Sequence, residues 1–553
     1  MPVLTVRARL KKRVLRDALI VFVAAVCVAL YLHWPAFVES DRFHDNWRQC
    51  PHWIAPESQQ YHPDDLLVRY AEFNTSPGGD WIYRTLALTG GDIIWGKINA
   101  VLFFAVTVLC VFITGRAMHS RSGGILAAVL FVFFPCIFKE YSGGFMSALS
   151  APLLCLTVLS LVRGTWWWAV ILMAAGSLIY PMVVIHSGMI YLIDVLIRDR
   201  KRLFDGHLWK MKYIPLIIAA LLSVSILSGK YIASGHEFGD LVSRSHIEDR
   251  VEFTDAGRYP LMPVPSLWDQ LAEHWGNWFH LALFLTAYFF LAKGVFRLPR
   301  GLYALLISSL CLYTLADIFL MRLYIPDRYL HFAVPMFMAL AGGYWLALVG
   351  EREGGRKIVM SMIAVVLIGV GIWEFHGEFE QGQKTWRYQR HDLYAYVRSL
   401  PGRPMIAVHP KRGSEIPLMT GKSVLISKEL SHPWWTEYWE IMTERTRDFF
   451  RAYYATDGDD IGAFVEKYGI SYWIIQQRHF TARYISRKRR LYMEPFDRWI
   501  KKNLHPSKEA ILNHVPRKYR LFDNGRYIVI SSEGLMRWLD DRREVENTEV
   551  IMQ

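Results

Sequence analysis

The residues best suited to chemistry lie in one polar segment, 38–95, between two apolar stretches of the sequence. It brings together carboxylates, imidazoles and a guanidinium: Asp41, His44, Asp45, Arg48, His52, Asp64, Asp65 and Asp80. A carboxylate in such a segment can act as a general base on an acceptor, or it can ligate a divalent cation. Asp45 and Asp41 are therefore the first candidates for a catalytic role, and Asp45 has the denser polar surroundings.

Each acid in this segment also has a plain structural reading. Asp41 and Asp45 could merely solvate the membrane interface, where Trp34, Trp47 and Trp53 could seat the segment at headgroup level. Asp64 and Asp65 follow a proline and open the helix-like run 66–73, so helix capping competes with a site role for both.

Further candidates come from other predicted loops on the same side of the membrane. Glu140 stands in the very short turn 139–144, where it could complete a site with Asp45 or pair with Lys139. Arg258, Arg322 and Arg328 are basic residues on a face where positive charge is otherwise sparse. A planar guanidinium can hold a phosphate by two-point contact, whereas snorkelling to lipid headgroups is the alternative for these arginines.

The elements that position these residues are predicted to be membrane helices. The chain is 53% hydrophobic yet 20% charged, and its apolar residues fall in blocks near the length that spans a bilayer. We count about eleven such blocks. They are 17–34, 95–114, 123–138, 144–162, 166–184, 185–197, 213–228, 278–295, 301–320, 329–349 and 358–374.

Charge sets the expected orientation. Basic residues precede the first block and recur in every second loop, which places the N-terminus in the cytoplasm. The first block lacks a small-residue cleavage site, so it is predicted to be a retained span. Loops 38–95 and 229–277 and the tail after residue 375 then face the extracytoplasmic side. The net charge of +13 lies largely in the inner loops, which argues against nucleic-acid binding.

The tail is predicted to be a separate α/β domain, so that 1–375 form the membrane domain and 376–553 the extracytoplasmic domain. Strand-like runs at 405–408, 423–427, 471–475 and 526–530 alternate with helical periodicity at 434–454 and 461–468. Asn524-Gly525 predicts a hairpin. A basic run extends from Arg478 to Lys508, which fits a solvated face, attraction to anionic lipid headgroups or binding of a phosphate-bearing substrate.

The arrangement of these motifs resembles the GT-C fold membrane glycosyltransferases, which include oligosaccharyltransferases, protein mannosyltransferases and aminoarabinose transferases. The likeness covers most of the membrane domain and rests on short motifs: an early acid in a long first outer loop, an acid in the next outer loop, and a Pro-x-Arg-Tyr element before the closing spans. It is nearest to uncharacterised bacterial members. The motifs read Asp45-Asn46-Trp47-Arg48-Gln49 with Trp53 and Asp65-Leu66-Leu67, then Glu140, then Pro326-Asp327-Arg328-Tyr329.

The resemblance implies a polytopic helical protein of the inner (plasma) membrane that moves a sugar from a polyprenyl-phosphate donor to a lipid, glycan or protein acceptor. Asp45 would be the base, with Asp41 and Glu140 as further catalytic candidates. Arg258 and Arg328 would neutralise the departing phosphate, while His44, His52 and Asp64 would position hydroxyl groups. The remaining substrate-binding candidates are Arg48, Asp65 and Arg322. If a divalent metal such as Mg²⁺ or Mn²⁺ takes part, Asp45 and Glu140 would hold it, although Glu140 stands alone where oligosaccharyltransferases carry paired acids.

Two other functional classes stay open at this level. A transporter or lipid-linked glycan flippase would need polar groups or broken helices near the bilayer midplane, for which segment 176–181 and Asp194 are the available hints. A non-catalytic assembly subunit that has kept the fold would tolerate replacement of the loop acids.

Overall fold

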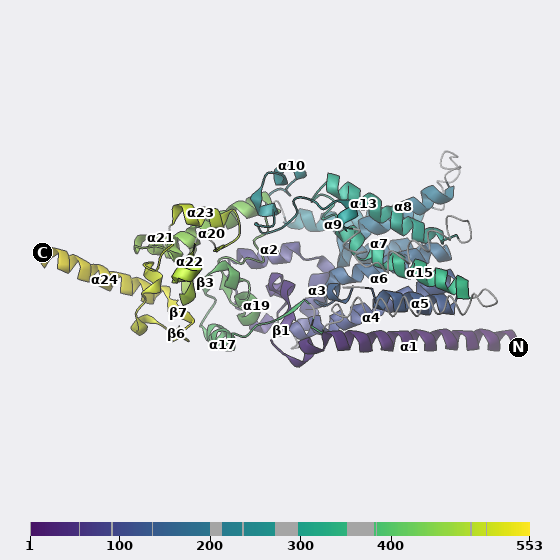
Figure 1. The fold of residues 1–553 in the computed structure, drawn as a ribbon, viewed down its shortest axis with the longest axis horizontal. Coiled ribbons are helices and arrows are strands. Elements are labelled where there is room, and N and C mark those ends of the chain that lie inside the picture. Colours follow the sequence, from purple (N-terminus) through teal and green to yellow (C-terminus); the bar gives the residue numbers. More distant parts are fainter. Residues whose placement is uncertain are drawn as a thin grey trace.

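The computed structural model describes residues 2–54, 56–89, 92–134, 137–199, 213–234, 237–270, 297–350, 381–382, 384–486, 489–504 and 506–552. At one end of the molecule lies a bundle of long apolar helices, and at the other lies a mixed sheet surrounded by helices (Figure 1). The segments that carry the candidate site residues lie between these two parts.

The bundle is a multi-pass membrane structure. Its helices are α1 (Pro2–Val38), α4 (Asp92–Met118), α5 (Arg121–Val132), α6 (Ser150–Arg163), α7 (Trp168–Ile179), α8 (Pro181–Asp199), α9 (Ile214–Ser234), α13 (Arg300–Ile318) and α15 (Ala333–Gly350). Among the described residues, 6 stretches are long and apolar enough to cross a membrane. Every predicted block contains a helix except 278–295 and 358–374, which lie outside the described residues.

Small residues allow the helices of this bundle to pack closely. Close packing matters in a membrane because lipid tails are as apolar as the side chains, so the hydrophobic effect does not drive helices together. Gly343 of α15 faces α5, and a Cβ at this position would lie 2.5 Å from the backbone nitrogen of Ala127. Gly124 of α5 approaches α4 in the same way, since its Cβ would lie 2.6 Å from the carbonyl oxygen of Phe112. Helix α5 is therefore held tightly between α4 and α15.

The C-terminal part is built on a sheet, as the alternation of strand and helix patterns predicts, and β6 is a fifth strand beyond the four strand-like runs. Its order is β4-β3-β5-β7-β6. Strands β4, β3 and β5 are parallel to one another, and β7 pairs antiparallel with both β5 and β6. The strands are β3 (Met405–Val408), β4 (Ser423–Val424), β5 (Ile470–Gln476), β6 (Phe522–Asp523) and β7 (Tyr527–Ser531). The predicted tight turn joins β6 to β7, and Gly525 adopts the positive φ that this turn requires.

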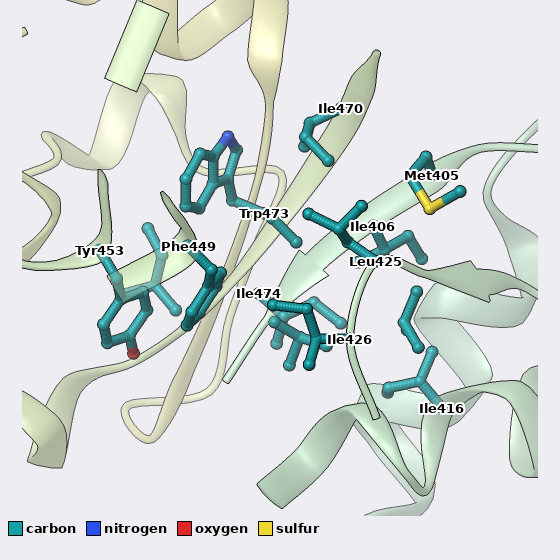
Figure 2. Packing of buried hydrophobic residues seen from close by; sticks show 14 of the residues in the cluster. Met405, Ile406, Ile416, Leu425, Ile426, Phe449, Tyr453, Ile470, Trp473 and Ile474 are labelled. Atoms are coloured by element: carbon teal, nitrogen blue, oxygen red, sulfur yellow. The ribbon is translucent and has the colours of Figure 1, made fainter. Parts of the chain in front are cut away.

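Helices cover this sheet with apolar side chains. They are α17 (His391–Ser399), α18 (Pro410–Gly413), α19 (Ile416–Thr420), α20 (Thr436–Tyr453), α21 (Asp459–Tyr468), α22 (Ala482–Ile485), α23 (Phe496–Asn503) and α24 (Ser532–Met552). Figure 2 shows Phe449 and Tyr453 of α20 beside Trp473 of β5, while Ile406 of β3 lies among neighbouring aliphatic side chains. Gly469 ends α21 in a left-handed conformation, as its position after the helical run predicts.

The first long loop packs against the C-terminal part and shares its apolar core. It contains α2 (Leu66–Asn74) and α3 (Pro77–Ala87), and short 3-10 turns at Asp45–Gln49 and Pro51–Trp53. Tyr70 of α2 stacks on Tyr438 of α20 with ring centroids 3.6 Å apart. A continuous cluster of buried side chains runs from Trp47 and Trp53 of the loop to the strands of the sheet. The predicted boundary at 375/376 lies outside the described residues.

A two-stranded ribbon, which the sequence patterns did not predict, fixes the start of this loop. Strand β1 (Arg42–His44) pairs antiparallel with β2 (Thr385–Arg387), so that Phe43 lies opposite Trp386. The segment after the last predicted span thereby returns to the first loop. Asp45, which directly follows β1, comes close to Tyr388, which directly follows β2.

Candidate active site

Asp45 begins the 3-10 turn Asp45–Gln49 and is held there by its neighbours. Its Oδ1 accepts a hydrogen bond of 2.7 Å from the hydroxyl of Tyr388, and its Oδ2 forms an ion pair with Arg48. The Asp45 side chain is nevertheless 38% exposed, against 8% for Asp41 and 13% for Glu140. Of the three candidate acids, Asp45 is thus the one that an acceptor could reach.

Arg48 connects this carboxylate to the C-terminal part through Glu429. The Arg48 guanidinium lies 3.2 Å from one Glu429 oxygen, and Arg258 lies 3.0 Å from the other. Arg258 also donates hydrogen bonds to the carbonyl oxygens of Lys428, at 2.6 Å, and Glu429, at 2.7 Å. Arg258 was predicted to bind phosphate, but its Nε and Nη2 are directed to the segment that follows β4.

Glu140 forms a second charged cluster. It ends the short turn Ile137–Glu140 and contacts His331 at 2.7 Å and the ammonium group of Lys384. Although burial alone would raise the pKa of the Glu140 carboxyl, the charges of His331 and Lys384 oppose it and hold this pKa well below its usual range. Glu140 thus forms ion pairs with His331 and Lys384, which neither reading of the sequence named.

His44 lies between the two clusters. It is the last residue of β1, and its Nδ1 accepts a hydrogen bond of 3.1 Å from the backbone N–H of Asn46. Burial lowers the pKa of His44 to about 4, with a smaller contribution from the nearby charge of Lys384 and opposing ones from Glu140 and Asp45. His44 is therefore neutral near pH 7, and Asp45 and Glu140 belong to one electrostatic neighbourhood.

Arg328 is the first residue of the short helix α14 (Arg328–His331). It is half-buried and lies near Asp327 and the side chains of Tyr180, Tyr259 and Tyr324. Its Nε is buried without a hydrogen-bond partner within the described part of the chain. Since α14 also carries His331, which contacts Glu140, Arg328 lies about one helical turn from the Glu140 cluster.

Strained backbone gathers in these segments. Among the described residues, the non-glycine positions with positive φ are Met321 (69°), Tyr324 (69°) and Lys384 (52°). Two of them shape the tight turn that leads to Arg328, and the third contacts Glu140. Bulky residues adopt this conformation rarely, and such outliers concentrate at functional sites.

Two other candidates lie near this region but in different settings. Asp41 is buried, with a carboxylate oxygen 3.2 Å from His391 and 3.6 Å from Arg387. It therefore binds the segment around β2 to the loop. Arg322 is exposed to solvent in the turn that precedes Arg328.

The remaining candidates stand apart from Asp45. His52 is buried, contacts Asp80 at 3.4 Å and lies 3.2 Å from the Thr75 hydroxyl. Asp65 is the N-cap of α2 and accepts hydrogen bonds from the backbone N–H groups of Leu67 and Val68. Asp64 is exposed. Trp47 and Trp53 are buried in the loop core rather than placed at a headgroup level, whereas Trp34 is exposed.

The capping geometry makes a prediction for these adjacent acids. We expect Asp65→Ala to lower the free energy of unfolding by about 1–2 kcal/mol, because two backbone donors at the start of α2 lose their acceptor. Asp64→Ala is the matched control and should stay within about 0.5 kcal/mol of the parent. Reversible denaturation in mixed micelles measures both values. Equal losses in the two variants would contradict the capping role.

Asp45 and Glu140 do not fit the divalent metal suggested for them. Both oxygens of Asp45 are engaged by Tyr388 and Arg48, and both oxygens of Glu140 by Lys384 and His331. A cation bound between the two acids would have to displace an ammonium and a guanidinium. No group of three or more His, Cys, Asp or Glu side chains in the described ranges is arranged to hold a metal ion.

Four residues of this site escaped the sequence reasoning: Tyr388, Glu429, His331 and Lys384. His331 gave a usable signal, since it lies three positions after Arg328 near the start of an apolar block. Lys384 and Tyr388 depend on the pairing of β1 with β2, which joins residues more than 340 positions apart. Glu429 depends on how the C-terminal part packs on the first loop.

The features that suggested a transporter have local explanations. Segment 176–181 forms the end of α7 and the start of α8, and Tyr180 between them is extended. Asp194 forms an ion pair of 3.2 Å with Arg198, one turn further along α8.

The fold of this chain is similar to that of solved membrane proteins. ArnT from Cupriavidus metallidurans bound to undecaprenyl phosphate matches 94% of this chain and 98% of its own length, with 11% identity and a TM-score of 0.51. The Archaeoglobus fulgidus oligosaccharyltransferase in complex with Zn and sulfate matches over 84% of this chain and 69% of its own, with 14% identity and a TM-score of 0.51. The chain has the GT-C fold.

The GT-C fold confirms the resemblance inferred from the short motifs, including the C-terminal sheet-containing domain. Comparisons with protein-family models and with curated protein sequences find no match. At 11–14% identity the likeness concerns the fold, so the chemistry of this GT-C protein has to be argued from its own residues.

Proposed function

We propose that this protein transfers a sugar from a polyprenyl-phosphate-linked donor to an acceptor hydroxyl at the extracytoplasmic face of the membrane. The observation that carries the proposal is the placement of Asp45, a reachable carboxylate held by Arg48 and Tyr388, together with Arg328, which shares the short helix α14 with the Glu140 partner His331. The Asp45 carboxylate can accept a proton, and the Arg328 guanidinium can hold a phosphate. The GT-C fold supports the class of reaction, because solved proteins of this fold include one bound to undecaprenyl phosphate.

Asp45 would act as general base. Its exposed carboxylate deprotonates the acceptor hydroxyl as the oxygen attacks the anomeric carbon, while Arg48 and the Tyr388 hydroxyl fix its orientation. The bond between the anomeric carbon and the phosphate oxygen breaks, and the bonding electrons leave with the phosphate. Asp41 and Glu140 are less suited to this role because their carboxylates are buried, Asp41 beside Arg387 and Glu140 beside Lys384.

Arg328 would stabilise the leaving phosphate. Its Nε is buried without a hydrogen-bond partner in the part of the chain that the structure describes, and a phosphate oxygen would be a suitable acceptor for it. It lies at the end of an apolar helix, where a lipid-borne phosphate would arrive. Arg258, which was expected to share this task, is committed to Glu429 and the Lys428 carbonyl and would act by holding the loops together.

Release of sugar from the donor tests this assignment. We expect Arg328→Gln to lower the rate of release from a radiolabelled polyprenyl-phosphate sugar by about 10²–10³-fold, the usual effect of removing a group that stabilises developing negative charge. Arg403→Gln, an exposed arginine of the C-terminal part, is the matched control and should behave as the parent. Release by Arg328→Gln at the rate of the control would remove Arg328 from the phosphate site.

A further inference from the structure

The carboxyl edge of the parallel strands in the C-terminal sheet has the layout of a ligand site. The chain leaves β3 for β4 on one side and later enters β5 on the other side of β3. Parallel strands present their carboxyl ends at one edge, and a crevice forms where successive connections diverge in this way. Segment 409–412 follows β3 at this edge, and segment 477–479 follows β5.

Basic side chains gather at this edge. Lys411 follows β3, Arg478 follows β5, and Lys428 lies shortly after β4, while Arg489 comes from the segment after α22. All four interact electrostatically, since Lys428, Arg489 and Arg478 each disfavour the charge of Lys411. Arg478 and Arg489 belong to the basic run noted in the sequence, but Lys411 and Lys428 come from elsewhere in the chain.

The acids nearby are already neutralised by other residues. Glu415 contacts Arg390 at 2.6 Å and Arg412 at 2.7 Å, and Glu429 pairs with two arginines of the membrane-side loops. Asp497 pairs with Lys501 at 2.8 Å and accepts a hydrogen bond from a backbone N–H. Within the described ranges, Lys411, Lys428 and Arg478 therefore have no carboxylate at ion-pair distance.

Burial and mutual repulsion both act on the charged groups at this edge. Burial lowers the pKa of Lys411 to about 8, and repulsion by Lys428 and Arg489 adds to this shift. Burial, together with the charges of Lys411 and Arg412, also keeps the pKa of His409 well below its usual range. The Nε2 of His409 is buried without a hydrogen-bond partner among the described residues. An anion at this edge would relieve the repulsion.

The edge lies next to the candidate active site. Lys428 directly precedes Glu429, and its carbonyl oxygen accepts a hydrogen bond from Arg258. Its ammonium group is attracted most by Glu429, is repelled by Arg258 and Arg48, and is attracted more weakly by Asp45. The excess positive charge thus extends from the sheet edge toward the proposed base. A ligand held at the sheet edge would be placed beside Asp45.

We propose that Lys411, Lys428, Arg478 and Arg489 bind a phosphate group of the acceptor, which is therefore a phosphorylated saccharide or a phosphorylated lipid headgroup. Guanidinium groups hold phosphate oxygens by two-point contact, and ammonium groups add point charges. This inference rests on the proposed glycosyl transfer for the role of the ligand. The binding itself requires only the sheet edge.

Calorimetric titration of the full chain in zwitterionic nanodiscs with inorganic pyrophosphate tests the site. We expect the Lys411→Gln, Arg478→Gln double variant to bind pyrophosphate at least about ten-fold more weakly than the parent. The Lys518→Gln, Arg403→Gln double variant removes the same charges from exposed positions and should bind as the parent does. Asp45→Asn should also keep pyrophosphate binding. No binding by the parent, or equal binding by the two double variants, would overturn the proposal.

Two further arms identify the source of the phosphate and separate this inference from the proposed function. Competition by glucose 1-phosphate would support a saccharide source, competition by phosphatidate in the nanodisc would support a lipid source, and competition by neither would overturn the acceptor role. Release of sugar from the donor to water is measured in parallel. If the parent releases none while pyrophosphate binding still depends on Lys411 and Arg478, glycosyl transfer fails and the phosphate site stands. If the parent releases sugar but does not bind pyrophosphate, the phosphate site fails and glycosyl transfer stands.

Discussion

Asp45→Asn is expected to lower the rate of sugar transfer by about 10²–10⁴-fold, the range that a positioned general base contributes. Asparagine keeps an oxygen that can accept the hydrogen bond from Tyr388, but it cannot take a proton from the acceptor. Transfer from a radiolabelled polyprenyl-phosphate sugar by purified protein in lipid bilayers measures the effect. The structure should be retained, because Asp45 is partly exposed and lies at the surface of the loop.

Two comparisons sharpen this result. Asp249→Asn removes an exposed acid of another loop and should transfer sugar at the parent rate. Asp41→Asn and Glu140→Gln alter buried ion pairs, so they should impair stability as well as transfer. Parent-like transfer by Asp45→Asn, combined with loss of transfer in a folded Asp41→Asn or Glu140→Gln variant, would move the base to that residue.

Glu429→Ala is expected to lower the free energy of unfolding by about 3–5 kcal/mol, because it leaves the nearly buried Arg258 guanidinium without its counter-charge and leaves Arg48 with Asp45 alone. Arg48 and Arg258 are 12% and 11% exposed, and both face this carboxylate. Since Arg48 also orients Asp45, transfer should fall together with stability. Reversible denaturation in mixed micelles and the transfer assay measure the two effects.

Glu440→Ala is the matched control for this substitution. Glu440 lies on the same C-terminal part but is exposed, so its loss should change the free energy of unfolding by less than about 0.5 kcal/mol. If Glu429→Ala were no more damaging than Glu440→Ala, the bridge from the first loop to the C-terminal part would not hold the site together.

Local patterns in the sequence predicted the described apolar helices, α2, α20, α21 and most of the sheet, because each depends on residues close in the chain. They did not predict α3, α17, α23 or α24. Apolar blocks of membrane length gave α4 and α13, and runs of β-branched residues gave β3 and β5. Strand β4 is shorter than predicted, since pairing with β3 extends over Ser423 and Val424 alone. The ribbon of β1 and β2 could not be predicted, because three-residue strands carry too little pattern.

For the candidate site, too, local sequence predicted some residues, whereas others depend on how the chain folds. Asp45, Glu140 and Arg328 could be singled out because each is a charged residue close to the end of an apolar block. Arg258 could be singled out because an arginine on the outer face departs from the charge bias. Their partners could not, since Glu429 and Tyr388 meet Arg48 and Asp45 only after the chain has folded back on itself. The distinction between Asp64 and Asp65 likewise needed the structure, in which only Asp65 faces the first turn of α2.

The measurement that tests the central claim most directly is sugar transfer by the purified parent protein in lipid, supplied with a panel of radiolabelled polyprenyl mono- and diphosphate sugars and phosphorylated acceptors. Our account predicts that at least one donor loses its sugar in the presence of the parent and keeps it in the presence of Asp45→Asn. Folded parent protein that leaves every donor intact would contradict it and would favour a transporter or a non-catalytic assembly subunit.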